Sequence, residues 1–331
     1  RQEQGDVTHQ RRVPLPELPI DQRIVNFTEV EGGYDDKNAQ EEAARCLACG
    51  ICSECMSCVF ACGKDAIDHD DVEKHLEINV GAVILAPGYQ IYNAHLSQEY
   101  GLGRYPNVVT ALQYERMLSA SGPTSGHVQR PSDDGSPQRI AFLQCVGSRD
   151  QSHDYCSSVC CMYAAKEAIM TIEHAHAEAR TVSGDGRVEC QVFFMDTRAY
   201  SKGYEEYYRR AQNKYGIEYT HCRLSDIKED PETRNLRVRF AAPFDGQERI
   251  QEKEFDLVVL SVGLLPNQEA LGLFKNERLK SDPFNYVEEV DEDINPGQTS
   301  VEGVFVAGSA SAARDIPDAI LHAGAAAAQA A

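Results

Sequence analysis

Residues 139–168 read RIAFLQCVGSRDQSHDYCSSVCCMYAAKEA, and this stretch decides the fold. Its apolar opening, Arg139–Gln144, predicts a buried strand, and Cys160–Ala177 predicts a helix. A strand and a helix joined by a turn form the first part of a strand–helix–strand unit. Where such a unit binds a dinucleotide, the turn carries GxGxxG so that the pyrophosphate reaches the helix amino terminus. The turn here lacks those glycines and carries cysteines.

Four thiols occupy this turn and the start of the helix: Cys145, Cys156, Cys160 and Cys161. In a reducing compartment, clustered thiols are typical of metal ligands or redox groups rather than structural disulfides. We therefore predict that a metal cluster replaces the dinucleotide at this position. Electrons would then arrive through the cluster rather than by hydride transfer. The alternative is that one or two of the cysteines are only buried packing residues.

The pattern of alternating strands and helices continues beyond this stretch. The expected elements are strand Gln191–Met195, helix Gly203–Tyr215, and strands near Glu218–His221, Leu236–Phe240 and Leu257–Ser261. This order predicts an α/β fold with a parallel, doubly wound sheet and a β-meander before the last strand. Nearer the termini we expect a short helix Asn38–Arg45, a strand Ile78–Leu85, a helix over residues 107–121, a strand Gly303–Ala307 and a helix Asp315–Ala331.

A further group of cysteines lies in CLACGICSECMSCVFACG, residues 46–63. Four of them have the C-x2-C-x2-C-x3-C spacing of bacterial ferredoxins: Cys52, Cys55, Cys58 and Cys62. Six cysteines exceed the ligands that one tetrahedral zinc needs, so we interpret the segment as an iron–sulfur segment. The extra pair, Cys46 and Cys49, is either spare or contributes to a second cluster with ligands from elsewhere in an assembly. Cys190 and Cys222 stand alone in expected strands and are interpreted as packing residues.

Composition limits the classes of function. The 331 residues suggest about two domains, and 32 basic against 52 acidic residues give a net charge of −20. That charge argues against nucleic acid and against an anionic membrane surface as partners. The apolar runs Gly81–Ala86 and Leu257–Leu260 are strand-sized, and Arg1–Arg12 has no secretory pattern, so we expect a cytoplasmic protein. The start without methionine and the alanine-rich end suggest part of a longer polypeptide.

The chain resembles the HdrA-type subunits of heterodisulfide reductase and their relatives, the flavin subunits of modular redox complexes. The motifs that carry the resemblance are ILAPGY (Ile84–Tyr89), YGLGRYPNVVTALQYERMLSASGPTSGH (Tyr100–His127), FLQCVGSRD with YCSSVCCMYAAKEA (Phe142–Ala168), DTRAYSKGYEEYYRRA (Asp196–Ala211) and GVFVAGSASAARDIPDAI (Gly303–Ile320). The resemblance extends over nearly the whole chain.

The resemblance implies a thioredoxin-reductase-like architecture, in which a second, nucleotide-like domain interrupts a discontinuous FAD domain. We expect an arm and cysteine-rich segment at residues 1–75 and a partial FAD domain at 76–135 and 255–331. A Rossmann-like domain would occupy residues 136–254 and carry the second cluster in place of NAD(P). The family's amino-terminal strand–GxGxxG–helix, which holds the FAD pyrophosphate, does not occur in these residues.

The resemblance also implies site residues. It implies a 4Fe–4S cluster on Cys145, Cys156, Cys160 and Cys161, next to the flavin, and it implies a lysine, here Lys166, near flavin N5, where a cation tunes the reactive ring. The residues expected at the remaining flavin site are Ala86, Pro87, Gly88, Gly308, Ser309, Asp315 and Ile316. The amino terminus of the last helix would stabilise negative charge on the reduced flavin.

These features predict an electron-transfer flavoprotein subunit with FAD and at least two 4Fe–4S clusters, in a hetero-oligomeric complex of a kind that can carry out electron bifurcation. Expected partners are a disulfide-reducing or acyl-CoA-reducing subunit, hydrogenase or formate dehydrogenase, and ferredoxin. One alternative is an NAD(P)H-dependent flavin reductase of the glutamate-synthase small-subunit type. A second alternative is a cluster-carrying scaffold without catalysis of its own.

Overall fold

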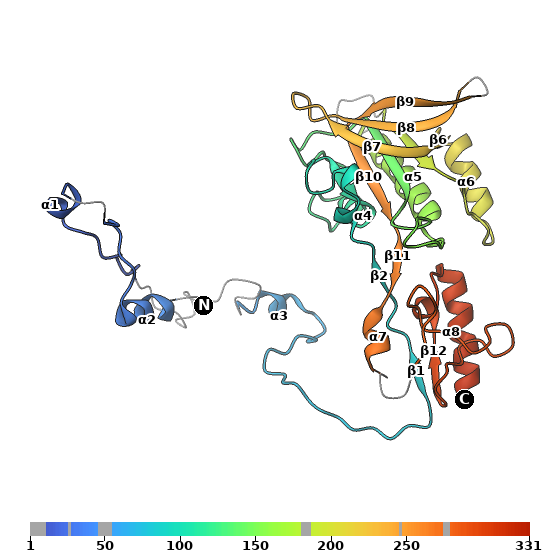
Figure 1. The fold of residues 1–331 in the computed structure, drawn as a ribbon, viewed down its shortest axis with the longest axis horizontal. Coiled ribbons are helices and arrows are strands. Elements are labelled where there is room, and N and C mark those ends of the chain that lie inside the picture. Colours follow the sequence, from blue (N-terminus) through green and yellow to red (C-terminus); the bar gives the residue numbers. More distant parts are fainter. Residues whose placement is uncertain (1–10, 26–27, 46–54, 180–186, 245–246, 274–278) are drawn as a thin grey trace. The chain divides into compact units, whose positions relative to one another are not determined.

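The computed structural model describes residues 11–25, 28–45, 55–179, 187–244, 247–273 and 279–331. The chain divides into two compact units, Arg1–Ile78 and Asn79–Ala331, and most of their helices and strands are labelled in Figure 1. The division falls three residues beyond the end expected for the amino-terminal segment, 75. We describe each unit by itself.

The first unit contains three short helices: α1 (Ile20–Arg23), α2 (Asp36–Ala44) and α3 (Ser57–Ala61). Asp35 caps α2 by accepting a hydrogen bond from the Asn38 N–H at 2.7 Å, which confirms the short helix expected here. None of the three helices contains a buried residue. Apolar packing therefore contributes little to the conformation of these helices.

The second unit is built on a five-stranded parallel sheet. The strand order is β3 (Val108–Thr110), β10 (Leu257–Val262), β4 (Arg139–Val146), β5 (Glu189–Phe194) and β6 (Glu218–His221). Because β10 lies between β3 and β4, strands far apart in the sequence form the centre of the sheet. This arrangement confirms the expected α/β class.

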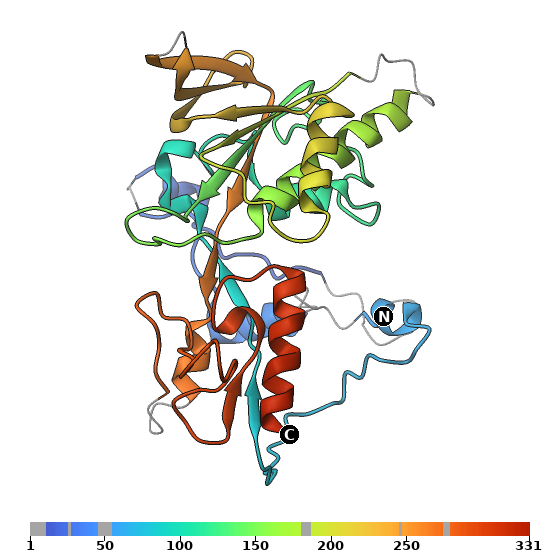
Figure 2. The same cartoon turned by 90° about the vertical axis from the view of Figure 1, so that its right-hand side faces the viewer.

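Alternate residues of β4 point to opposite faces of the sheet, as the strand period requires. Ile140 and Phe142 pack against the helices α4 (Ala111–Leu118), α5 (Cys160–Ala179) and α6 (Tyr204–Asn213). Ala141 and Leu143 pack against the antiparallel meander β7 (Arg223–Glu229), β8 (Leu236–Phe244) and β9 (Gln247–Phe255). Figure 2 shows the helices and the meander on opposite sides of the sheet. The expected meander is therefore present, and it covers the face opposite the helices.

The sheet crosses the expected domain boundaries. Strand β3 with helix α4, and strand β10, lie in the segments 76–135 and 255–331, yet both strands are hydrogen-bonded into the sheet of β4. Strand β10 pairs with β3 and β4 at once, so its residues complete the core of the nucleotide-like part. The helix expected over 107–121 also begins later than predicted, because β3 precedes it.

A smaller part of the second unit pairs β1 (Val83–Leu85) with β12 (Val304–Val306) in parallel. Helix α8 (Ile316–Ala330) runs alongside both strands (Figure 2). Strand β1 is shorter than the expected Ile78–Leu85, because its partner β12 has only three residues with which to pair. The carboxyl ends of two parallel strands meet at one edge, so the segments after β1 and β12 come together.

The remaining elements connect these parts. Strand β2 (Tyr89–Ile91) pairs antiparallel with β11 (Leu264–Pro266). The other short elements are α7 (Gln268–Leu273), η1 (Ala94–Leu96), η2 (Gln98–Tyr100) and η3 (Gly308–Ala310). No helix in the described ranges is both long and apolar enough to cross a bilayer.

Candidate functional site

The turn between β4 and α5 has an unusual backbone. Cys145, Gly147 and Arg149 have positive φ angles of 60°, 75° and 59°, and the residues between them do not. Positive φ is uncommon for residues other than glycine, so two such residues in five mark a specialised turn. The Ser148 N–H donates to the Cys145 carbonyl at 3.3 Å, and the Arg149 N–H donates to the His153 and Tyr155 carbonyls at 2.7 and 3.0 Å, so the turn folds back on itself.

Gly147 fixes this turn against the segment after β2. A Cβ atom placed there would lie 2.1 Å from the ring of Tyr92, and the φ angle of 75° also disfavours a side chain. The residue must therefore be glycine if the turn is to approach Tyr92 this closely.

The turn brings the four predicted ligands together. The Cys160 thiol, 1% exposed at the first position of α5, contacts the thiols of both Cys145 and Cys161. Hydrogen bonding from Cys160 lowers the pKa of Cys145, and it lowers the pKa of Cys161 to about 7. Burial raises the pKa of Cys156, and negative charge on Cys161 and Cys145 raises it further. The thiols thus form one electrostatically linked group.

This group differs from a site for one metal ion. Within the described ranges, no three side chains of His, Cys, Asp or Glu are arranged to hold a single ion. A cubane cluster instead takes one thiolate on each of several irons. Four thiols gathered at one turn are a donor set that fits such a cluster.

An ion pair ties this turn to the next strand. The guanidinium of Arg149 binds the carboxylate of Asp196, which follows β5, and Arg198 approaches the same carboxylate at 3.5 Å. In dinucleotide-binding folds an acidic residue about 20 residues after the glycine turn binds the ribose. Here the acidic group beyond the second strand is engaged by the cysteine turn itself. Sequence reasoning missed this pair, although both residues lie within the motifs quoted above.

Two buried polar side chains flank Cys145 without a hydrogen-bond partner in the part of the chain that the structure describes. Gln144 is 6% exposed and Ser148 is 1% exposed, and neither the amide of the first nor the hydroxyl of the second has a hydrogen-bond partner. Each unpaired buried group costs about 1–3 kcal/mol. Both side chains line a cavity of about 260 Å³ together with Cys145 and Arg149. These orphaned groups indicate that a bound group completes the site.

The cysteines assigned to packing are buried. Cys190 is 3% exposed in the core beneath the helices, and Cys222 is 5% exposed in the core beneath the meander. Cys222 in addition lines the cavity beside Cys145. It therefore lies closer to the candidate site than the sequence suggested.

The ferredoxin-like segment lies in the first unit, and the structure describes only part of it. Cys55 and Cys58 are exposed, and Cys62 is half-buried. Backbone N–H groups that follow Cys62 lower the pKa of its thiol, led by that of Ala66 at 3.3 Å from the sulfur. The His69 Nε2 atom lies 3.7 Å from the Cys58 sulfur. The other predicted ligands lie outside the described residues: Cys46, Cys49 and Cys52.

Lys166 lies on α5, where its ammonium pairs with the Glu115 carboxylate of α4 at 2.6 Å. Both side chains are about two-fifths exposed. Its placement near flavin N5 stays a prediction. The neighbouring Glu167 is 2% exposed, and burial raises its pKa to about 9, so this acid is neutral at physiological pH. Sequence reasoning did not single out Glu167.

The predicted flavin residues divide between two adjoining segments. Ala307, just before Gly308, donates its N–H to the Leu85 carbonyl at 2.8 Å, which joins the segment after β12 to the segment after β1. The predicted residues after β1 are Ala86, Pro87 and Gly88, and those around η3 and the start of α8 are Gly308, Ser309, Asp315 and Ile316. Asp315 caps α8 by accepting from the Asp318 N–H at 2.9 Å.

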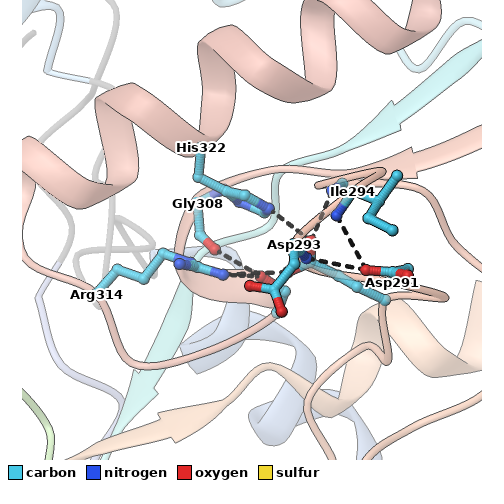
Figure 3. A network of polar contacts seen from close by, with 9 residues as sticks. Asp291, Asp293, Ile294, Gly308, Arg314 and His322 are labelled. Carbon is cyan, nitrogen blue, oxygen red and sulfur yellow. Dashed lines mark hydrogen bonds and ion pairs between the residues drawn. The ribbon is translucent and has the colours of Figure 1, made fainter.

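A buried polar network supports the second of these segments (Figure 3). The Gly308 N–H donates to His322 Nδ1 at 2.9 Å, and His322 Nε2 lies 3.0 Å from the Glu289 carboxylate. Arg314 also contacts Glu289, at 3.1 Å. Although burial opposes ionisation, hydrogen bonds from His322 and from the Gly297 N–H hold the pKa of Glu289 at about 2. The network fixes the backbone of Gly308 and was not predicted from the sequence.

Two groups at the start of α8 are buried without a partner among the described residues: Asp315 Oδ2 and Arg314 Nε. Asp315 is 4% exposed. An acceptor and a donor beside a helix amino terminus suit a ligand with hydroxyl and anionic groups. The residues present therefore fit the ribityl and ring portions of a flavin.

Comparisons with known proteins bear on both parts. The model of the family described as pyridine nucleotide-disulphide oxidoreductase matches residues 172–330. Among solved structures, the chain is similar to thioredoxin reductase from T. acidophilum, with a TM-score of 0.45 and 17% identity over 75% of this chain and 64% of that one. Thioredoxin reductase from Lactococcus lactis gives a TM-score of 0.43 at 17% identity, with the same shares covered.

Sequence relatives are more similar. The A-type iron-sulfur subunit of CoB--CoM heterodisulfide reductase from Methanocaldococcus jannaschii is 42% identical over 280 residues, 84% of this chain and 40% of that protein. The A-type subunit of H(2):CoB-CoM heterodisulfide,ferredoxin reductase from Methanothermobacter marburgensis is 40% identical over 282 residues, 85% of this chain and 41% of that protein. The chain thus spans about two-fifths of the length of these relatives. It belongs to the HdrA family of heterodisulfide reductase subunits, which are oxidoreductases.

Proposed function

We propose that this chain is part of an electron-transfer flavoprotein subunit that passes electrons between FAD and 4Fe–4S clusters. The observation that carries the proposal is the gathering of four thiols at the β4–α5 turn, where a dinucleotide pyrophosphate would otherwise lie. The Arg149–Asp196 pair strengthens it, because that pair engages the acidic group beyond β5.

The cluster ligands in this proposal are Cys145, Cys156, Cys160 and Cys161 in the second unit, and the ferredoxin-spaced group in the first. Cys52, Cys55, Cys58 and Cys62 would hold the first cluster, with Cys46 and Cys49 as further ligands. When bound, such clusters supply one-electron transfer. The chain's own contribution is to gather the thiols at one turn and to keep the Cys161 thiol easy to deprotonate.

For the flavin, we propose that residues after β1 and β12 hold one side of the isoalloxazine and the ribityl chain. Gly88 has a positive φ of 72° and open space around its Cα, which allows close approach of a ligand. Asp315 offers an unpaired carboxylate oxygen, and Lys166 is proposed to lie near N5. The bound flavin would exchange electrons in pairs or singly. The remaining FAD contacts would come from a strand–GxGxxG–helix outside these residues.

The domain division proposed here follows the sequence: residues 1–75, then 76–135 with 255–331, then 136–254. Within the proposed FAD domain, β3 and β10 belong to the sheet of β4. The flavin itself would therefore contact only the segments around β1, β12 and α8. Electrons crossing between flavin and cluster would then pass between two parts of the second unit.

The partners in this proposal follow from the names of the relatives. Those names mention hydrogen, formate, ferredoxin and the CoB-CoM heterodisulfide for the proteins concerned. We propose a cytoplasmic hetero-oligomer with a disulfide-reducing or acyl-CoA-reducing subunit, hydrogenase or formate dehydrogenase, and ferredoxin. Electron bifurcation belongs to the same proposal.

Anaerobic reconstitution with iron and sulfide tests the clusters. The wild-type chain should take up about eight irons and give cluster signals in EPR after reduction. Cys156→Ser should lower the iron content by about four per chain, whereas Cys190→Ser, which removes a buried thiol of the core, should leave it unchanged. Uptake of fewer than about four irons by the wild type, or of zinc in their place, would refute the proposal.

One observation favours a second function. The description of the matching family model names a pyridine nucleotide. An NAD(P)H-dependent flavin reductase is therefore the competing candidate. Flavin-loaded protein mixed anaerobically with NADH or NADPH separates the two candidates. The electron-transfer proposal expects no bleaching of the flavin absorbance on the timescale of turnover, whereas rapid bleaching would favour the reductase.

A further inference from the structure

The orphaned polar groups beside Cys145 are the starting point. Gln144 directly precedes Cys145, and the Ser148 N–H donates to the Cys145 carbonyl at 3.3 Å. Both side chains are more than nine-tenths buried, and both line the same cavity as Cys145. Within the described ranges, their amide and hydroxyl groups have no hydrogen-bond partner. Two unpaired donors therefore stand on either side of a predicted cluster ligand.

Two other polar side chains around this cavity, those of Arg149 and Asp150, are already engaged. The Arg149 guanidinium binds Asp196, and the Asp150 carboxylate accepts from the Ser152 and His153 N–H groups at 2.8 and 2.7 Å. The remaining walls include the apolar side chains of Phe193, Phe194, Met195 and Leu224. Tyr100 and Arg223 line the cavity as well, yet Gln144 and Ser148 have no hydrogen-bond partner among the described residues, so a bound group would supply what they contact.

Sulfur in an iron–sulfur cluster is a suitable acceptor. The cluster core and its thiolates carry negative charge, which grows by one unit on reduction, and donors to the sulfurs are a recognised determinant of the potential. A glutamine amide has two donor hydrogens and a serine hydroxyl has one. The Gln144 carbonyl oxygen needs a donor in its turn, and the cavity of about 260 Å³ has room for a water there.

We infer that Gln144 and Ser148 donate hydrogen bonds to sulfur on the Cys145 side of the cluster and raise its reduction potential. The inference rests on the proposed function, because it requires a cluster on the four cysteines. Both residues are positioning and tuning groups, and neither exchanges electrons. Their donors stabilise the reduced cluster more than the oxidised one, because the reduced cluster carries the larger negative charge.

The test is a redox titration followed by EPR. It uses the whole chain, reconstituted anaerobically with iron and sulfide, in a background that silences the first cluster. In that background the six cysteines of the first unit are serine: Cys46, Cys49, Cys52, Cys55, Cys58 and Cys62. Gln144→Leu and Ser148→Ala remove the donors one at a time and together, with little change in volume.

Each single variant should lower the midpoint potential. The double variant should lower the ratio of reduced to oxidised cluster at a fixed potential about tenfold, which is 59 mV for one electron. Gln191→Leu is the matched control. Gln191 is also a buried glutamine, 3% exposed, but it lies on β5 opposite Ala141, its amide donates to Glu218 and Thr220, and it should leave the potential unchanged.

The outcomes separate this inference from the proposed function. A background protein without iron or EPR signal refutes the cluster assignment itself. A normal cluster whose potential is the same in Ser148→Ala and in the double variant overturns the inference alone. If Gln144→Leu loses its cluster, the potential of Ser148→Ala decides, and an unchanged value there also overturns the inference. A downward shift in Ser148→Ala with no shift in Gln191→Leu supports it.

Discussion

The two cysteine-bearing regions of this chain are built in opposite ways. In the first unit, Cys58 lies in α3, a helix of five residues that buries none of them. In the second unit, Cys145 is the last residue but one of β4, a strand with a buried core, and Cys160 begins a helix of 20 residues. One region is exposed, and the other is anchored on both sides by apolar packing.

This difference indicates which interactions hold each group of thiols in its conformation. At the β4–α5 turn the positive φ angles, the close approach of Gly147 to Tyr92 and the Arg149–Asp196 pair fix the thiols through the protein. Around Cys58 and Cys62 the described residues offer only local hydrogen bonds. Metal binding is coupled to folding where a site is not preformed. We therefore expect the first region to depend on its cluster and the second to depend on its core.

The largest expected effect comes from the core behind the second region. Phe142→Ala should lower the free energy of unfolding of the second unit by about 3–5 kcal/mol, because Phe142 is fully buried beneath the helices. Urea unfolding followed by far-ultraviolet circular dichroism measures this. Phe60→Ala is the matched control in the first region, since Phe60 is 76% exposed in α3, and it should change stability by less than about 0.5 kcal/mol. Similar losses of unfolding free energy in both variants would contradict the view that only the second region is held by apolar packing.

The next effect concerns Glu167, in the helix that begins with Cys160. Because burial raises its folded pKa to about 9, the folded protein holds a proton that the unfolded chain releases near pH 4.5. Between pH 4.5 and about 9, the free energy of unfolding should therefore be highest at the acidic end. It should fall by up to about 1.4 kcal/mol per pH unit as the pH rises towards 9.

Glu167→Gln should remove this slope and stabilise the second unit by about 2–3 kcal/mol at pH 8 relative to its effect at pH 6. Unfolding free energies at several pH values between 6 and 9 measure the difference. Glu173→Gln changes an exposed carboxylate of the same helix and should leave the slope in place. A slope that persists in Glu167→Gln would show that another group carries it.

Much of the second region could be predicted from the sequence. The strand Glu218–His221 has the bounds expected, and the four clustered cysteines share one turn, because period and spacing are local properties of the chain. Strands β7 and β9 were not located individually. Their sequences, RLSDIKE and QERIQEKEF, are largely polar, and burial on only one face leaves a weak apolar pattern.

What the sequence could not provide are contacts between distant segments. Lys166 and Glu115 pair across 51 positions, and Gly308 depends on His322 and Glu289, which pair across 33 positions. Charged residues are common on any surface, so nothing local selects these partners. The sheet order has the same cause: β10 enters between β3 and β4 only because the chain returns after the meander.

Removal of iron should also affect the two cysteine-bearing regions differently, with a smaller effect than the changes above. With a chelator under reducing conditions, protease cleavage within residues 55–78 should become about tenfold faster, because the cluster no longer holds that segment. Cleavage between residues 139 and 177 should change much less, since the core remains. Limited proteolysis with mass mapping of the cut sites gives both rates in one experiment. Equal acceleration in the two segments would mean that the second region also depends on its cluster for its shape.

The smallest expected effect is that of the Arg149–Asp196 ion pair, which joins the β4–α5 turn to the segment after β5. Arg149→Leu leaves the Asp196 carboxylate with Arg198 alone, and both partners are partly exposed, so the loss in unfolding free energy should be about 1 kcal/mol. Lys253→Met breaks a more exposed pair with Glu218 and should cost less than about 0.5 kcal/mol. Urea unfolding of both variants measures the two losses. If Arg149→Leu costs no more than Lys253→Met, the turn is held by its backbone and by Gly147 rather than by charge, and the contrast between the two regions then depends on packing alone.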